Sequence, residues 1–174
     1  SFVMTSNSDM YRSPIELGWA KSIRFDHDFL GRAALEREIE APGRKMVTLV
    51  WDADDVTQIY AALFRKGELP PYMELPRHLA EHGVWADAVV AGGQVIGVAT
   101  SRCYSAYFRE MISLCVINRE FAEPGTDVSV LWGKGDSQRR IRAKVAQAPY
   151  KQDKRRIDVS ALPPSHAVAE PNPA

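Results

Sequence analysis

The stretch that decides the fold is residues 92–118, which read GGQVIGVATSRCYSAYFREMISLCVIN. Gly92 and Gly93 separate two apolar runs, a pattern typical of a two-residue hairpin turn. Residues 95–100 and 111–117 are short and rich in β-branched side chains, so they are predicted to be buried strands. The link between them, residues 101–110, carries tyrosines, a phenylalanine and two arginines. Such a link is either a ligand platform or a packed barrel corner, and residue types alone favour the corner.

Further strands are predicted on both sides of this stretch. Residues 44–51 and 86–91 are apolar runs, whereas residues 127–132 and 138–148 alternate apolar and polar side chains. Short strands joined by turns, with few helices, predict a mainly β fold. The expected architecture is a small antiparallel β-barrel with helices at its rim and flank.

Two helices and one more strand are predicted around these elements. Residues 23–26 alternate and suggest a short strand. Asp28 is a candidate cap for a helix over residues 29–40, whose expected buried stripe is Leu30, Ala33, Ala34 and Leu35. A second helix is predicted over residues 52–64, capped by Asp52 or Asp54.

The composition is that of an ordinary globular protein. The chain has 174 residues, 45% of them hydrophobic and 25% charged, which suits one domain with extensions. Lys+Arg and Asp+Glu both number 22, and this balance argues against bulk attraction to nucleic acid or an anionic membrane. No apolar run approaches the roughly 20 residues that a membrane-spanning helix needs. We therefore expect neither a nucleic-acid nor a membrane partner.

Cysteine and histidine usage gives two further expectations. Cys103 and Cys115 are expected to be free thiols in a reducing compartment, the cytoplasm, because no secretion signal precedes them. His78 and His82 have the spacing of a metal-binding pair on a helix. The Glu of an HExxH motif is missing and no third ligand is evident, so no metal site is predicted.

The two ends of the chain differ from its middle. The sequence begins at Ser1, and its polar, turn-like start predicts the exit from an upstream unit, so we expect a fragment. The predicted organisation is the end of an upstream domain with its connecting helix over residues 1–42, a barrel over 43–150 and a tail over 151–174. Within the tail, residues 163–174 are rich in Pro and Ala and are expected to pack loosely.

An ordered set of motifs carries a family resemblance. In chain order the motifs are Ser13-Pro14-Ile15-Glu16, Trp19, residues 24–35, residues 44–49, Gly93, residues 97–101, Pro124-Gly125 and Pro149-Tyr150. Together they resemble the C-terminal half of the aminomethyltransferase family, the glycine-cleavage T-protein and its relatives. No single motif is decisive, but the ordered set is specific.

Departures from the family pattern indicate a branch. Arg102 stands where the family has Gly, Ser105-Ala106 replaces Ser-Pro, and the helical insert over residues 52–67 is absent from ordinary T-proteins. With residues 9–16 and 104–110, the sequence looks most like the tetrahydrofolate-dependent aryl O-demethylases that act on vanillate or syringate.

The resemblance implies transfer of a methyl group from an aryl methyl ether to N5 of tetrahydrofolate. In the family, folate and substrate are held mainly by an N-terminal folate-binding domain that this sequence lacks, and the C-terminal barrel covers one side. The implied partners are that missing domain and a methoxy-aromatic small molecule. We therefore expect this chain alone to be inactive.

Tyr11 and Glu16 are the leading site candidates. Tyr11, next to Arg12, is proposed to protonate the phenoxide leaving group, although it could equally anchor a domain junction. Glu16 matches the family glutamate that meets the pterin ring, where a carboxylate accepts two N–H bonds. Its alternative role is that of an exposed first-turn Glu favoured by the helix dipole.

The remaining candidates keep two interpretations each. Trp19 either stacks on the pterin or closes the core. Arg44 and Arg102 either pair with a glutamyl carboxylate of folate or are solvated strand-end arginines. Tyr104 is expected at the interdomain cleft, a position that Tyr107 and Arg109 could share, or else on the packed corner.

Three other functions remain open on the sequence. The parent protein could be the aminomethyltransferase of glycine cleavage. The chain could also be a non-catalytic structural barrel in a folate-dependent multidomain protein, or a freestanding small barrel that acts as a binding module.

Overall fold

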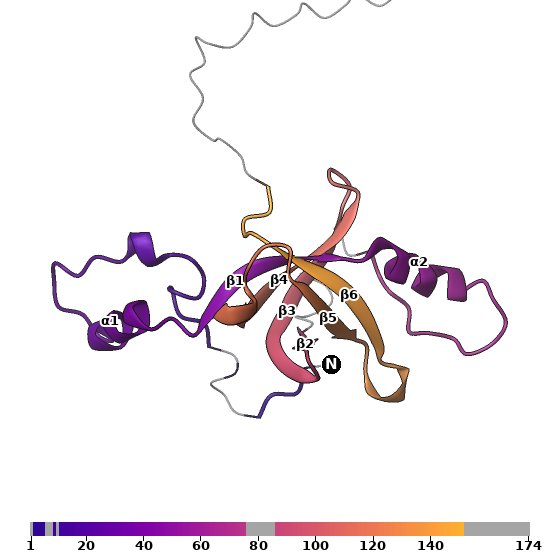
Figure 1. Ribbon diagram of the computed structural model, residues 1–174, viewed down its shortest axis with the longest axis horizontal. Helices are drawn as coiled ribbons and strands as arrows, with labels where there is room; N and C mark the ends of the chain where they lie inside the picture. The colour runs from indigo at the N-terminus through magenta and orange to yellow at the C-terminus, as the bar shows by residue number, and fades with distance from the viewer. Residues whose placement is uncertain (1, 6–8, 10, 76–85, 152–174) are drawn as a thin grey trace, which may run out of the picture.

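The computed structural model describes residues 2–5, 9, 11–75 and 86–151, and its centre is a closed antiparallel β-barrel (Figure 1). The strands follow the order β1-β4-β3-β2-β5-β6 around the barrel. Their bounds are β1 (Arg44–Trp51), β2 (Ala86–Ala91), β3 (Gln94–Ser105), β4 (Glu110–Asn118), β5 (Asp127–Trp132) and β6 (Arg139–Ala146). The barrel predicted from the sequence is confirmed.

The Gly92-Gly93 pair forms the turn between β2 and β3. Both glycines have positive φ, 56° and 80°, which is the requirement of a two-residue hairpin turn whose twist matches that of its strands. The predicted hairpin is therefore confirmed, and it sets the β2–β3 register that begins with Ala91 opposite Gln94.

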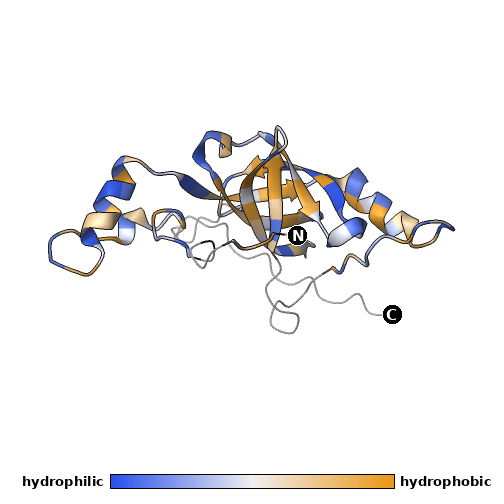
Figure 2. Ribbon diagram, turned by 90° about the horizontal axis from the view of Figure 1, so that it is seen from below, coloured by the Kyte–Doolittle hydropathy of each residue, from blue (hydrophilic) through white to orange (hydrophobic). Residues whose placement is uncertain are grey.

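Side chains along a barrel strand alternate, so that one points into the core of the barrel and the next faces solvent. On β6, Ile141, Ala143 and Val145 are buried, whereas the arginines and lysine between them are exposed. Hydrophobic residues concentrate in the barrel strands (Figure 2). Two buried polar groups of the core pair with each other, since the Trp51 indole donates to the Ser113 hydroxyl at 3.0 Å.

The β3–β4 hairpin is longer than the sequence predicted. Pairing continues past residue 100 to Ser105 opposite Glu110, so the far ends of both strands project beyond the barrel (Figure 1). A register shift lies between Thr100 and Cys103, where Ser101 has a φ of 55°. The link predicted over residues 101–110 is thus mostly strand.

Helix α2 (Ala53–Ala62) follows β1 directly and confirms the second predicted helix. The Asp52 carboxylate accepts the Asp55 backbone N–H at 3.0 Å, which makes Asp52 the N-cap. Ile59 is the buried residue of the helix. The helix and the loop after it lie at the end of the barrel opposite α1 (Figure 1).

Helix α1 (Arg32–Glu40) forms later than predicted and buries none of its residues. The stripe expected on it is wrong: Leu30 precedes the helix and is fully exposed, Ala33 and Ala34 are exposed, and Leu35 is half-buried. The helix stands away from the barrel (Figure 1), so the barrel does not cover that face.

The strand predicted at residues 23–26 does not form. Residues 23–25 are irregular and follow a short 3-10 turn, η2 (Ala20–Ser22). An alternating segment needs a strand edge to pair with, and the barrel is closed.

Short turns complete the described chain. One 3-10 helix, η3 (Arg119–Phe121), follows β4, and another, η4 (Gly135–Ser137), joins β5 to β6. No helix in the described ranges is long and apolar enough to cross a membrane. His78, His82 and the predicted tail beyond residue 151 lie outside the described residues.

Candidate functional site

Ser13 and Glu16 form a reciprocal cap at the start of a turn. The Ser13 hydroxyl accepts the Glu16 backbone N–H at 3.1 Å, and the Glu16 carboxylate accepts the Ser13 backbone N–H at 3.2 Å. This arrangement is a capping box, and Pro14 in the next position is already shaped for helical backbone. The local sequence therefore fixes where the Glu16 side chain points.

Arg44 holds the other oxygen of the same carboxylate. Its Nε donates to Glu16 Oε1 at 2.5 Å, and the Glu16 side chain is only 8% exposed. The Met46 backbone N–H also donates to the Glu16 carbonyl at 2.7 Å, so the turn is bonded to β1. The Ser13 hydroxyl in turn donates to Glu38 of α1. Three segments thus meet at Glu16.

The Glu16 carboxylate retains acceptor capacity after these contacts. An ionised carboxylate offers about four lone-pair sites on its two oxygens, and the recorded side-chain bonds use one on each oxygen. The arrangement is an oriented anion that can still accept N–H donors.

Tyr11 and Trp19 lie on either side of this turn and are both exposed. Tyr11 is 71% and Trp19 61% accessible. Trp19 therefore does not close the barrel core. The Arg12 guanidinium donates to the backbone carbonyls of Asp9 and Tyr11, at 2.8 Å and 2.7 Å, rather than to the Tyr11 hydroxyl.

Tyr104 lies on the projecting β3–β4 hairpin instead. It pairs with Met111 and is 42% exposed, and Tyr107 near the tip is 75% exposed. Of the predicted site residues, the contacts recorded in the described part of the chain join only Glu16 and Arg44 directly.

The tip of the β3–β4 hairpin contacts residues that follow β6. The contacts are made by Phe108, Glu110 and Tyr150, none of which was predicted to be a site residue. The Phe108 and Tyr150 rings meet at 4.8 Å, and the Tyr150 hydroxyl donates to the Glu110 carboxylate at 2.6 Å. That hydrogen bond, with burial, raises the pKa of Tyr150 to about 12. Lys151 lies 4.8 Å from the Tyr107 ring centroid.

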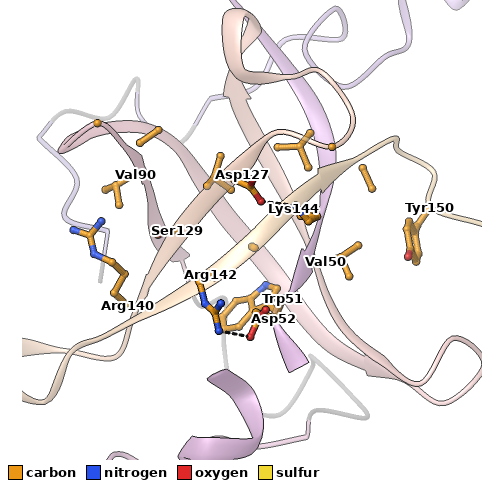
Figure 3. Close-up of a pocket in the computed structure, with 17 residues that line it drawn as sticks. Val50, Trp51, Asp52, Val90, Asp127, Ser129, Arg140, Arg142, Lys144 and Tyr150 are labelled. Atoms are coloured by element: carbon orange, nitrogen blue, oxygen red, sulfur yellow. Dashed lines mark hydrogen bonds and ion pairs between the residues drawn. The ribbon is translucent and has the colours of Figure 1, made fainter. Parts of the chain in front are cut away.

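A separate groove of about 830 Å³ runs along β6 (Figure 3). Arg140, Arg142 and Lys144 follow it at alternate positions. Lys144 pairs with Asp127 at 2.5 Å, and Arg142 pairs with Asp52 at 2.9 Å (Figure 3). Arg142 also bonds Asp55. The predicted site residues do not line this groove.

Arg102, the other arginine predicted to bind folate or to be solvated, has aromatic neighbours that the sequence did not predict. Its guanidinium carbon lies 5.6 Å from the Trp51 ring centroid and 5.8 Å from that of Trp132. Arg102 therefore contacts the tryptophans at one end of the barrel. Its position in place of a family Gly was the available signal, but a sequence does not show what a strand residue packs against.

Comparison with known proteins agrees with the fold. Residues 75–151, which contain β2 to β6, match the model of the glycine cleavage T-protein C-terminal barrel domain. The crystal structure of glycine cleavage system aminomethyltransferase T from Bartonella henselae superposes with a TM-score of 0.53 over 80% of this chain and 32% of that chain. Since the identity is 16%, this likeness concerns the fold alone.

Curated relatives share more of the sequence. Sesamin methylene transferase from Sinomonas sp. (strain No.22) is 39% identical over 163 residues, covering 87% of this chain and 36% of that protein. Syringate O-demethylase from Sphingobium sp. (strain NBRC 103272 / SYK-6) is 32% identical over 161 residues, covering 86% and 35%. An aminomethyltransferase from Geobacillus sp. (strain WCH70) is 31% identical over 142 residues, covering 79% and 30%.

The chain thus spans about a third of the length of the relatives it matches, 36% and 35% for the first two. Both the family model and the relatives agree with the ordered motifs of the sequence and with the six-strand barrel. Residues 75–151 are thus a glycine cleavage T-protein C-terminal barrel domain, within a chain that is similar over most of its length to members of that family.

Proposed function

We propose that this chain is the C-terminal portion of a tetrahydrofolate-dependent methyltransferase that moves a methyl group from an aryl methyl ether to tetrahydrofolate. The observation that carries the proposal is the Glu16 carboxylate, which Arg44 and Ser13 orient in a turn whose flanking residues Tyr11 and Trp19 are exposed. A relative named syringate O-demethylase supports the choice of substrate class.

Glu16 is proposed to recognise the pterin of the cofactor. The 2-aminopyrimidinone edge of a pterin presents N–H donors, and the remaining lone pairs of an oriented carboxylate accept them. Arg44 keeps the carboxylate in place rather than contacting the pterin itself. Trp19, 61% exposed, offers a face for ring stacking.

Tyr11 is proposed as the proton donor. As the methyl carbon passes from the ether oxygen to N5 of the folate, the C–O bond breaks and its electron pair stays on the phenoxide. The Tyr11 hydroxyl gives that oxygen a proton and recovers one from N5 by way of solvent, so the products are a phenol and methyltetrahydrofolate. Tyr104 on the hairpin is proposed to approach the cofactor from the barrel side.

Residues 1–42 are proposed to pack against an N-terminal folate-binding domain that supplies the other walls of the site. This segment exposes several large apolar side chains: Tyr11 at 71%, Trp19 at 61%, Leu30 at 104% and Ile39 at 43%. Contiguous exposed apolar surface marks interaction sites, and we propose that these side chains contribute to one. Because the chain spans about a third of its relatives, we propose that it is inactive alone. The free thiols Cys103 and Cys115 fit a reducing compartment such as the cytoplasm.

The test is an assay of the complete parent protein with syringate and vanillate, with and without tetrahydrofolate. We expect turnover only with tetrahydrofolate. Tyr11→Phe should lower kcat by about 10²-fold or more. Glu16→Gln should raise the KM for tetrahydrofolate by about tenfold or more, because a hydrogen bond to a charged group is lost. Arg140→Gln, in the groove along β6, is the matched control and should leave both constants unchanged.

Two results would contradict the proposal. Demethylation without tetrahydrofolate would remove the cofactor assignment, and wild-type kinetics in Tyr11→Phe would remove the proton donor. The second candidate is an aminomethyltransferase of glycine cleavage, favoured by relatives of that name. It predicts activity with the aminomethyl donor and none with methoxy-aromatic acids. Full activity in both variants would instead favour a non-catalytic structural barrel.

A further inference from the structure

The Arg102 guanidinium lies at the end of the barrel where α2 is found. The β3 register shift between Thr100 and Cys103 falls at this residue, and a bulge of this kind re-aims a side chain. The guanidinium carbon lies within cation–π range of Trp51 and Trp132, which are 3% and 7% exposed. The two indole rings hold the guanidinium in place.

Arg102 differs from the other well-placed arginines of the described chain. Its Nη1 is buried and has no hydrogen-bond partner among the described residues. By contrast, four arginines bond a carboxylate directly: Arg32, Arg44, Arg139 and Arg142. A buried guanidinium N–H without an acceptor costs the desolvation of a charged donor, so its retention points to an acceptor that comes from elsewhere.

The Arg102 guanidinium keeps its positive charge. Burial lowers its pKa, and the nearby acidic side chains of Asp87 and Glu74 oppose that effect. The Tyr60 hydroxyl already donates to the Met73 carbonyl at 2.7 Å, so it does not compete for the same ligand. Arg102 as a whole residue is only half-buried, so part of it is exposed to solvent.

We propose that this end of the barrel binds the carboxylate of a small acid, with Arg102 as the cation that receives it. The planar guanidinium fork matches two carboxylate oxygens, whereas the indoles hold its face and leave its edge to the ligand. The site is separate from Glu16 and does not depend on methyl transfer. Tyr60 of α2, which belongs to the insert over residues 52–67, lies near the same cation.

The test uses the ¹⁵N-labelled chain and its four tryptophan indole N–H signals. Acetate, benzoate and inorganic phosphate are titrated at constant ionic strength. We expect saturable shifts of the Trp51 and Trp132 signals with acetate and benzoate, and none of the exposed Trp19, which serves as the internal control. Arg102→Gln should abolish the shifts, and Arg140→Gln should preserve them.

Arg102→Lys keeps a charge but lacks the fork, so it should weaken acetate binding by about tenfold or more. If Arg102→Gln does not fold, the acetate affinity of Arg102→Lys serves as the test of the proposal. Unsaturable shifts, equal binding by Arg102→Lys, or tighter binding of phosphate than of either carboxylate would overturn the proposal. Shifts with benzoate alone would support it and assign the site to aromatic acids.

Discussion

Gly97 marks the place where β3 and β4 approach each other most tightly among the described glycines. A Cβ at this position would lie 2.8 Å from the Val116 carbonyl oxygen and 3.0 Å from the Ile117 Cα. Both are backbone atoms, which cannot rotate away. The absence of a side chain at Gly97 is therefore a packing requirement of the barrel wall.

Gly97→Ala is expected to lower the free energy of unfolding by about 1–3 kcal/mol, because the strands must separate to admit the methyl group. Urea denaturation measures the change. Gly43→Ala is the matched control, since nothing lies within 4 Å of a Cβ there and its φ is not positive. Equal stability of the two variants would contradict the packing argument.

The two thiols are expected to differ in reactivity. Cys115 is 1% exposed, and burial raises its pKa to about 12. Burial also raises the pKa of Cys103, which is only half-buried. Since the thiolate is the nucleophile, iodoacetamide at pH 8 should alkylate Cys103 well before Cys115 in the native chain. Mass spectrometry follows the reaction, and the difference should vanish in urea. Equal alkylation rates of the two thiols in the native chain would contradict this expectation and show that the barrel opens readily.

At this scale the sequence identified residues but not their partners. It singled out Glu16 and Arg44 separately, whereas their ion pair joins positions 28 residues apart. The Trp51–Ser113 bond spans 62 residues and left no local trace. Arg102 was noted as a departure from a family Gly and as a candidate partner of a folate carboxylate, but its contacts with Trp51 and Trp132 were not predicted. Pairings of this kind depend on strand register, which side-chain types alone do not fix.

A helix was predicted correctly, together with its buried face, where the sequence carried a local signal and another element covered the apolar side of the helix. For α2, the Asp52 cap and the buried Ile59 agree, and the helix formed as predicted. For α1, periodicity predicted a helix correctly but assigned a buried face that the barrel does not cover (Figure 1). Periodicity reports which face is apolar, not whether a partner is present. The wrong strand at residues 23–26 has the same origin.

The link between α2 and β6 should be sensitive to acid. Hydrogen bonds from Arg142 lower the pKa of Asp55 below its usual 3.8. A carboxylate with a lowered folded pKa stabilises the fold above its unfolded pKa, and this contribution is lost as the pH falls through the lower folded value. The stabilisation is thus complete near pH 6 and disappears below about pH 3.8.

Asp55→Asn is expected to lower Tm at pH 6 by no more than about 4 °C, because the pair is partly exposed. The difference from the unsubstituted chain should shrink as the pH falls below 3.8. Thermal melts followed by circular dichroism between pH 2 and 7 measure it, with the exposed Asp54→Asn as the control. A difference that stays constant with pH would contradict the assignment.

For the whole molecule, the closed barrel was predictable because strand patterns, turns and family motifs agreed. Its strand order was not, since β1 closes the barrel between β4 and β6, far away in the sequence. The site was predictable only in part. Tyr11, Trp19 and Tyr104 are exposed on separate segments, and nothing in the described chain brings their rings together.

The chain of 174 residues should bind tetrahydrofolate at least about 100-fold more weakly than the complete parent protein. The reason is that Glu16 and its neighbours provide one wall of the proposed pocket. Isothermal titration of both proteins gives the ratio of Kd values. Glu16→Gln in the parent is the reference for loss of this wall. Equal affinity of chain and parent would show that the pocket is complete within these residues.

The closure of the sheet also limits how other molecules can recognise this protein. Each strand has a hydrogen-bonded neighbour on both sides, including β6 against β1. Along the closed wall, a foreign peptide therefore finds no row of open backbone groups to extend, and neither does a second barrel. The projecting ends of β3 and β4 are the exception among the described strands, because β2 pairs with β3 only as far as Thr100. Recognition at the barrel wall has to go through side chains, and the wall offers no exposed edge that could seed fibrils as long as the barrel stays shut.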